Sequence, residues 1–171
     1  LNYPLGIHYR EKGFYHEFHE HLPLNEWKKS GNNEFYQRIE ELTDTFKGRI
    51  AERNNLLNFV LNKTKGYSSI QGNPGIGKSA LTAQFFKDLR GNKEASNVHV
   101  VEYFIRRGTV QAKADYLFNY LIKRTDELFP EGRNIRAEGK AVFDLQNQLF
   151  SKWRLWHEKS QGKKLLFLID G

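Results

Sequence analysis

The sequence predicts an α/β fold in which helices flank a parallel sheet. A candidate strand at residues 67–71 and short apolar runs at residues 97–105 and 165–169 alternate with longer stretches whose apolar residues recur at helical spacing. The last of these runs is continuously apolar, which is typical of a parallel strand covered on both faces. A chain of 171 residues suffices for one domain, or one domain with an appendage, and for a sizeable core.

The composition excludes several classes of protein. The chain has no Cys, so it forms no disulfide, thiol nucleophile or Cys-based zinc site, and we expect a cytoplasmic location. It has no apolar run of about 18 residues and no signal-peptide pattern, so we expect no membrane-spanning helix and no membrane partner. It begins with Leu1 and has no Met, so we expect it to be a piece of a longer protein.

Residues 1–45 are expected to be a linker or the end of a preceding domain. No clear period is present in its first half. His16, His19 and His21 are spaced H-x-x-H-x-H, for which a metal site is conceivable. On a helix the third histidine turns away from the other two, so solvated polar side chains are the favoured interpretation.

Two helices are predicted before the first strand. One covers Glu34–Phe46, and the other follows a break at Gly48. In each helix the apolar residues fall on one face. The two apolar stripes are Phe35, Ile39, Leu42 and Phe46 in the first helix, and Leu56, Leu57, Val60 and Leu61 in the second.

A glycine-rich loop, Gly72–Ser79, lies between a predicted strand, Tyr67–Gln71, and a predicted helix, Lys78–Arg90. The apolar residues of this helix recur every four positions and predict one buried face: Leu81, Phe85 and Leu89. It reads GNPGIGKS and matches the phosphate-binding pattern G-x-x-x-x-G-K-[ST] in the strand–loop–helix context that the pattern needs. Glycines let the backbone wrap closely around a phosphate group, because they add no side chain and tolerate unusual φ and ψ angles. The sequence therefore predicts a nucleotide-binding protein.

The loop is expected to contact phosphate in three ways. The N–H groups of residues 75–78 point inward at anionic oxygens, and the N-terminus of the following helix adds partial positive charge. The ammonium group of Lys78 reaches the β- and γ-phosphates, and the hydroxyl of Ser79 is a ligand for Mg²⁺.

The second strand is predicted over Asn97–Ile105, and Arg106 and Arg107 follow it. Ligands of open α/β sheets bind outside the carboxyl ends of the strands, so one of these arginines is a candidate contact for a γ-phosphate or a partner subunit. The alternative is a pair of solvated loop cations. Two further helices are predicted over Ala112–Phe129 and Lys140–Ser160. Apolar residues at three- and four-residue steps in the second predict a stripe that packs in the core: Val142, Leu145, Leu149, Trp153 and Trp156.

The final strand, Leu165–Ile169, is followed by Asp170, which we expect to lie near the phosphate loop. A carboxylate in this place holds Mg²⁺, usually through water, opposite Ser79. The alternative role is a turn or a helix cap. Lys78 and Asp170 are therefore the predicted catalytic residues, and Ser79 and Asp170 are the predicted metal ligands.

The formal net charge of +7 is unevenly spread along the chain. Residues 1–45 carry five Lys or Arg and eight Asp or Glu, whereas residues 46–171 carry 22 and 12. A basic surface attracts nucleic acid, which is therefore a possible partner. We favour the interpretation that a nucleotide site and solvated helix faces supply the excess.

Together these segments resemble the STAND class of P-loop ATPases, and its NACHT-like members in particular. GNPGIGKS is typical of their phosphate loop, and residues 46–53, FKGRIAER, resemble the F-x-G-R-x-x-E segment ahead of it. Residues 100–106 resemble their second strand, and residues 165–171 resemble the start of their Walker B motif. The resemblance covers residues 46–171, which we expect to be the N-terminal part of a P-loop NTPase domain.

The resemblance implies an ASCE-type P-loop NTPase fold, truncated after the Walker B strand and preceded by a short helical segment. It also implies that ATP or ADP binds with Mg²⁺ under a loop carrying Gly48 and Arg49. The residues expected to bind nucleotide are Gly48, Arg49, Gly72, Asn73, Pro74, Gly75, Ile76, Gly77, Lys78, Ser79 and Ala80.

Proteins of this class are slow, regulated ATPases that close with ADP and form homo-oligomers with ATP. They usually carry an effector domain before the ATPase and a sensor array after it, and many act in immune, antiviral or cell-death signalling. Two other functions stay open: an AAA+-like ATPase acting on nucleic acid or protein, and a module whose nucleotide stabilises an oligomer without turnover. A GTPase is disfavoured, because residues 1–171 contain no guanine-specific signature.

Overall fold

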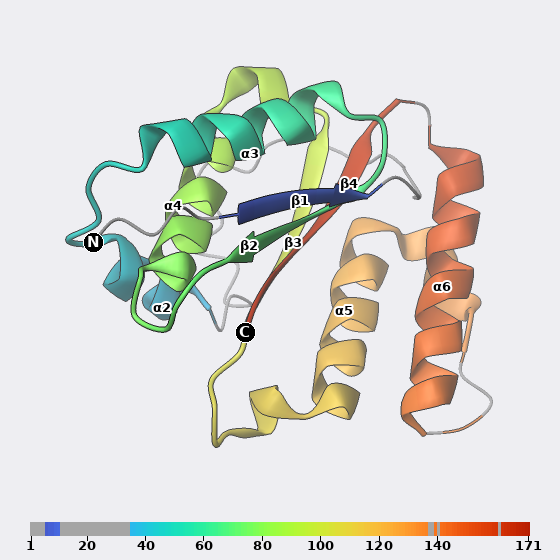
Figure 1. The fold of residues 1–171 in the computed structure, drawn as a ribbon. Coiled ribbons are helices and arrows are strands. Elements are labelled where there is room, and N and C mark those ends of the chain that lie inside the picture. Colours follow the sequence, from blue (N-terminus) through green and yellow to red (C-terminus); the bar gives the residue numbers. More distant parts are fainter. Residues whose placement is uncertain (1–5, 11–34, 137–138, 140, 161) are drawn as a thin grey trace. The chain divides into compact units, whose positions relative to one another are not determined.

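The computed structural model describes residues 6–10, 35–136, 139, 141–160 and 162–171 (Figure 1). These residues divide into two compact units. The first unit contains the described residues up to Ser96, together with Asp170, and the second contains those from Asn97 to Ile169, together with Gly171. The prediction for the three histidines at positions 16, 19 and 21 lies outside the described residues.

The described helices and strands follow the order predicted from residue 34 onward. Those of the first unit are β1 (Gly6–Arg10), α2 (Tyr36–Thr43), α3 (Ile50–Asn62), β2 (Tyr67–Gln71) and α4 (Lys78–Gly91). Those of the second unit are β3 (Val98–Phe104), α5 (Ala114–Leu128), α6 (Val142–Lys159) and β4 (Lys164–Asp170). Short 3₁₀ helices cover Lys93–Ala95, Val110–Ala112 and Pro130–Asn134.

β2 pairs with β1 in an antiparallel ladder, in which Gly6 lies opposite Gln71 and Arg10 opposite Tyr67. The expectation of one parallel sheet is therefore wrong for β2 in the described part of the chain. The ladder gives hydrogen-bond partners to the N–H and C=O groups along one edge of β2. β1 was not predicted, because the sequence around it shows no clear period.

β3 and β4 form the other described sheet, and they run parallel as predicted. The strands begin side by side, because the backbone N–H of Lys164 donates to the carbonyl of Asn97 at 2.7 Å. They also end together, because a Cβ on Gly171 would lie 2.8 Å from Cδ1 of Ile105. With a parallel strand pair and five α-helices among the described residues, the chain has an α/β fold.

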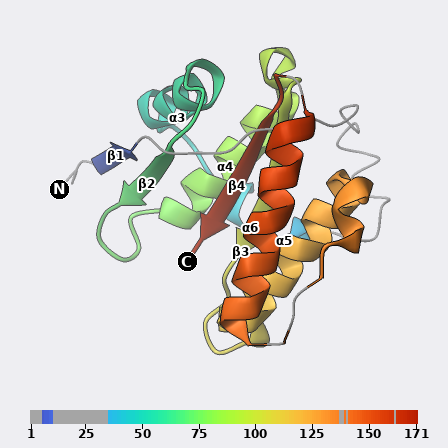
Figure 2. The same ribbon diagram turned by 90° about the vertical axis from the view of Figure 1, so that its right-hand side faces the viewer.

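Helices α5 and α6 pack against each other and lie on one side of the β3–β4 pair (Figures 1 and 2). Trp153 of α6 covers Phe167 of β4, with 4.3 Å between ring centroids. β3 is almost wholly buried, but β4 is only half-buried and Ile169 is 48% exposed. The expectation that β4 is covered on both faces is therefore wrong among the described residues, since both helices of this unit cover the same face.

The apolar stripe predicted for α6 is confirmed over most of its length. Leu145, Leu149 and Trp156 are buried, and Trp156 stacks on Phe129 with 5.9 Å between ring centroids. Val142, at the start of the helix, is 39% exposed, and Trp153 is half-buried.

Helix α4 is the centre of the first unit. Its predicted stripe, Leu81, Phe85 and Leu89, is fully buried. α2 and α3 both pack on α4, and the predicted apolar faces are buried in part: Ile39, Leu56 and Val60 are buried, whereas Leu42, Leu57 and Leu61 are half-buried. This packing holds the beginning of α3 and the beginning of α4 in one compact unit. No described helix is long and apolar enough to cross a membrane.

A bidentate ion pair also joins α3 to α4. Nε and Nη2 of Arg53 donate to the carboxylate of Asp88 at 2.5 and 2.7 Å, and Gln84 donates to the same carboxylate at 2.9 Å. The hydrogen bond with Asp88 is the main cause of a raised pKa of Arg53. Two parallel N–H···O bonds fix the orientation of a guanidinium more firmly than a single contact does.

We expect Arg53→Met to lower the free energy of unfolding by about 1 kcal/mol, the upper range for a partly exposed ion pair. Urea denaturation followed by circular dichroism measures this change. Adding Asp88→Asn to Arg53→Met is expected to cost less than the sum of the two single changes, because both remove the same contact. Strict additivity would show that Arg53 and Asp88 are not coupled.

Candidate phosphate-binding site

The loop between β2 and α4 has the backbone conformation that its glycines permit. Gly75 and Gly77 have φ angles of +79° and +90°, in the left-handed region. A Cβ on either residue would meet no atom within 4 Å, so the backbone conformation, and not crowding within the chain, selects glycine there. The N–H of Ile76 donates to the carbonyl of Asn73 at 3.3 Å and closes the turn.

Six backbone N–H groups of this segment donate no hydrogen bond to any described residue: those of Gly72, Asn73, Gly75, Gly77, Lys78 and Ser79. The last three lie at the N-terminus of α4, where a helix leaves its first N–H groups without intrahelical partners. Free N–H groups and the helix dipole together favour a bound anion. The N–H of Ile76, which was also expected to face the phosphate, is engaged in the turn.

The side chain of Lys78 lies over the loop. Its Nζ donates to the carbonyls of Gly72 and Asn73 at 2.9 and 3.1 Å, and these contacts are exposed to solvent. The ammonium group is therefore held beside the free N–H groups by two neutral acceptors. A phosphate oxygen is a stronger partner for an ammonium group than a carbonyl is.

Asp170, at the end of β4, groups with the first unit. Burial raises the pKa of its carboxyl group above the ordinary value, while the Ser79 hydroxyl and the charges of Arg38 and Lys78 lower it. The two predicted metal ligands are therefore brought together next to Lys78. Arg38, on α2, was not predicted, because no local pattern links it to the loop or to Asp170.

These residues fit a magnesium ion that is also held by phosphate. Mg²⁺ usually takes one or two carboxylates, several waters and substrate phosphates rather than an all-protein cage. In keeping with this, the described residues contain no cluster of three or more His, Cys, Asp or Glu side chains that would hold a metal by itself. Ala80, in the first turn of α4, is half-buried beside Ser79 in the sequence.

We expect Asp170→Asn to leave the ligand-free protein at least as stable as the wild type at pH 7. A carboxyl group whose pKa is raised by folding favours the native state at low pH and loses that contribution as pH rises through the raised pKa. The amide has no ionised form, so it removes this unfavourable contribution. Thermal unfolding between pH 4 and 8 measures the change, and clear destabilisation at pH 7 would contradict the prediction.

The same variant is expected to lose the contribution of Mg²⁺ to nucleotide binding, a loss of about tenfold or more in affinity if one charged contact disappears. Titration of ATP with and without Mg²⁺ tests this part. Equal Mg²⁺ dependence in the variant and the wild type would exclude Asp170 as a ligand.

The side chain of Arg49, which follows Gly48, also reaches the phosphate loop. Both have left-handed backbone conformations, with φ angles of +80° and +54°. Nη2 of Arg49 donates to the carbonyl of Ile76 at 3.1 Å, and Nη1 donates to Glu52 at 3.0 Å. A backbone hydrogen bond at Glu52, and then its pair with Arg49, lower the pKa of this carboxyl group. The role of Gly48 and Arg49 beside an adenine ring stays a prediction.

Glu52 was not among the predicted site residues. The sequence does indicate its pair with Arg49, because residues three apart on a helix are neighbours and the two side chains have opposite charges. The sequence does not reveal the contact of Arg49 with Ile76, since 27 positions separate the two residues.

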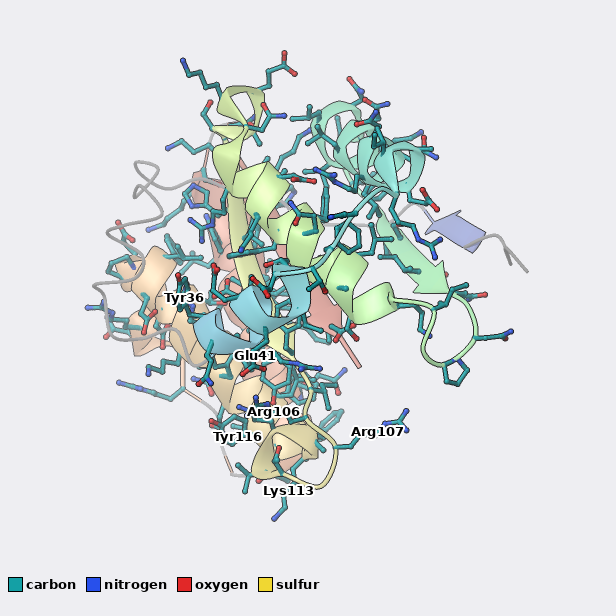
Figure 3. All side chains as sticks on the ribbon, turned by 90° about the vertical axis from the view of Figure 1, so that its left-hand side faces the viewer. Tyr36, Glu41, Arg106, Arg107, Lys113 and Tyr116 are labelled. Atoms are coloured by element: carbon teal, nitrogen blue, oxygen red, sulfur yellow. The ribbon has the colours of Figure 1, made fainter. Side chains whose placement is uncertain are left out.

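Arg106 and Arg107 lie in the second unit, directly after β3. Both arginines are exposed, and Arg107 extends away from the ribbon (Figure 3). Thr109 shapes this turn, because its hydroxyl donates to the carbonyl of Arg106 at 2.7 Å. A contact of either arginine with a γ-phosphate or a partner subunit stays a prediction.

No protein-family model matches the chain, and comparisons with curated proteins and with solved structures gave no match. The resemblance to STAND ATPases therefore depends on the motifs of the sequence alone.

Proposed function

We propose that this protein binds ATP and ADP with Mg²⁺ at the loop Gly72–Ser79 and that it is the nucleotide-binding part of a STAND-class P-loop ATPase. The observation that carries the proposal is the set of free N–H groups on a loop whose glycines are left-handed, with the ammonium of Lys78 held over them. Such a set of donors, in a strand–loop–helix context, favours the phosphates of a nucleotide.

In this proposal each residue has a distinct task. The free N–H groups and Lys78 bind the β- and γ-phosphates and stabilise the charge that shifts during phosphoryl transfer. Ser79 and Asp170 hold Mg²⁺, which neutralises charge on the phosphate oxygens when it is bound. Burial disfavours the ionised form of Asp170 and raises its pKa, because fewer waters solvate the charge. A cation bound beside the carboxylate offsets this loss of solvation.

Turnover is proposed to be slow. Hydrolysis needs a group that orients the attacking water. On the resemblance we propose a switch that holds its nucleotide, in which ATP promotes homo-oligomerisation in a signalling pathway of defence or cell death.

Calorimetric titration of the chain with ATP, ADP and adenosine, each with Mg²⁺, tests the proposal. We expect ATP and ADP to bind and adenosine to bind at least about a hundredfold more weakly, because the contacts described are to phosphate and each charged hydrogen bond contributes about 1.5–3 kcal/mol. Failure of both ATP and ADP to bind would refute the proposal. GTP binding as tight as that of ATP would refute its adenine specificity.

A further inference from the structure

We propose that Arg49 is a positioning residue of the phosphate loop, and that its hydrogen bond to the carbonyl of Ile76 turns the N–H of Gly77 toward the phosphate. The inference rests on the proposed function, because it assigns a task at the same loop. In this role Arg49 contacts the backbone of the phosphate loop, not the adenine ring.

The argument begins with the geometry of one peptide unit. The carbonyl of Ile76 and the N–H of Gly77 belong to the same planar trans peptide, so they point in opposite directions. Nη2 of Arg49 holds that carbonyl at 3.1 Å from one side. The N–H of Gly77 is therefore directed to the side of the loop away from Arg49, and it donates no hydrogen bond to any described residue.

Glycine by itself does not hold this orientation. Gly77 has a φ angle of +90°, and glycine reaches both signs of φ with similar ease, so the peptide before it is free to rotate unless another group fixes it. Arg49 supplies that restraint from the start of α3. A donor that is already oriented binds an anion more tightly, because no ordering is needed when the ligand arrives.

Arg49 is itself held in place. Its second terminal nitrogen pairs with Glu52 at 3.0 Å, and both side chains are about three-quarters buried. Its backbone is left-handed at φ +54°, an unfavourable conformation for a residue with a side chain. Unfavourable backbone conformations persist where surrounding contacts determine them, and here they are found beside the loop.

The test compares ligands with and without an adenine ring. Arg49→Ala and the wild type are titrated with ATP and with inorganic tripolyphosphate, each with Mg²⁺. We expect the variant to bind both ligands about tenfold to a hundredfold more weakly, since one oriented N–H···phosphate contact is lost. Arg154→Ala is the matched control, because Arg154 is an exposed arginine on α6 and its loss changes the net charge equally.

Two further measurements separate positioning from general loss of structure. The amide resonance of Gly77 is expected to shift strongly when ATP binds the wild type and much less in Arg49→Ala. Glu52→Gln keeps Arg49 but weakens its anchor, and we expect a smaller loss, below about tenfold, for both ligands. If Arg49→Ala does not fold, Glu52→Gln tests the inference in its place.

The outcomes that would overturn the inference are distinct. Weaker binding of ATP with unchanged binding of tripolyphosphate would make Arg49 an adenine contact. Unchanged binding of both ligands, or an equal shift of the Gly77 resonance in the variant, would show that Arg49 does not orient the N–H of Gly77. If the wild type binds neither ligand, the proposed function fails first and the inference falls with it.

Discussion

Replacing Lys78 with alanine is expected to weaken the binding of ATP and of ADP by at least about a hundredfold. The ammonium group lies over the loop on two carbonyls, so it is placed to form charge-assisted bonds with phosphate oxygens. Each such bond contributes about 1.5–3 kcal/mol, and two bonds account for a change of this size. Isothermal titration calorimetry measures both affinities.

The fold itself should not change in this variant. The contacts of Lys78 with Gly72 and Asn73 are exposed, so water replaces the lost donor. Lys65→Ala, which removes the same charge from an exposed position before β2, is the control and should bind like the wild type. Affinity that survives Lys78→Ala would remove the basis for placing the nucleotide at this loop.

Replacing Lys152 with methionine is expected to lower the free energy of unfolding by about 3–5 kcal/mol, the cost of breaking a buried ion pair from one side. The side chain of Lys152 is 0% exposed, and its Nζ donates to Asp126 at 2.5 Å and to the carbonyl of Gly132 at 2.6 Å. Methionine fills most of the space of the lysine but leaves a carboxylate and a carbonyl without a donor. A loss of this size is a large part of the stability of a typical domain.

Urea denaturation followed by tryptophan fluorescence measures this effect, since Trp153 and Trp156 lie on the same helix as Lys152. Adding Asp126→Asn to Lys152→Met is expected to recover part of the loss, because the unpaired charge is then absent. Lys159→Met, at an exposed position of α6, should change stability by less than about 0.5 kcal/mol. A loss below about 1 kcal/mol for Lys152→Met would show that the pair with Asp126 contributes no more to stability than a surface ion pair does.

Much of the local structure could be predicted from the sequence. β2 has the predicted bounds, Tyr67–Gln71, and α4 begins at Lys78, directly after the left-handed Gly77. Strands β3 and β4 lie within one residue of their predicted bounds at each end. Side-chain period and turn chemistry act over a few residues, so the sequence alone carries them.

The candidate site was predicted less completely. The loop and its lysine were predictable, because one continuous pattern contains them. Arg38 and Glu52 were not assigned to the site, and the contact of Arg49 with the carbonyl of Ile76 had no signal at all. A backbone acceptor has no side-chain signature, so a hydrogen bond to it is invisible in a list of residue types.

The sequence by itself determined the α/β alternation, the apolar stripes of α2, α4 and α6, and the phosphate-loop pattern, because each depends on residues that are close along the chain. Only the tertiary structure decided the pairing of β1 with β2, the burial of Lys152 against Asp126, and the grouping of Asp170 with Ser79. These features join segments between 26 and 91 positions apart, across separations at which neither period nor spacing selects a partner. Packing and the need to pair buried polar groups make that selection.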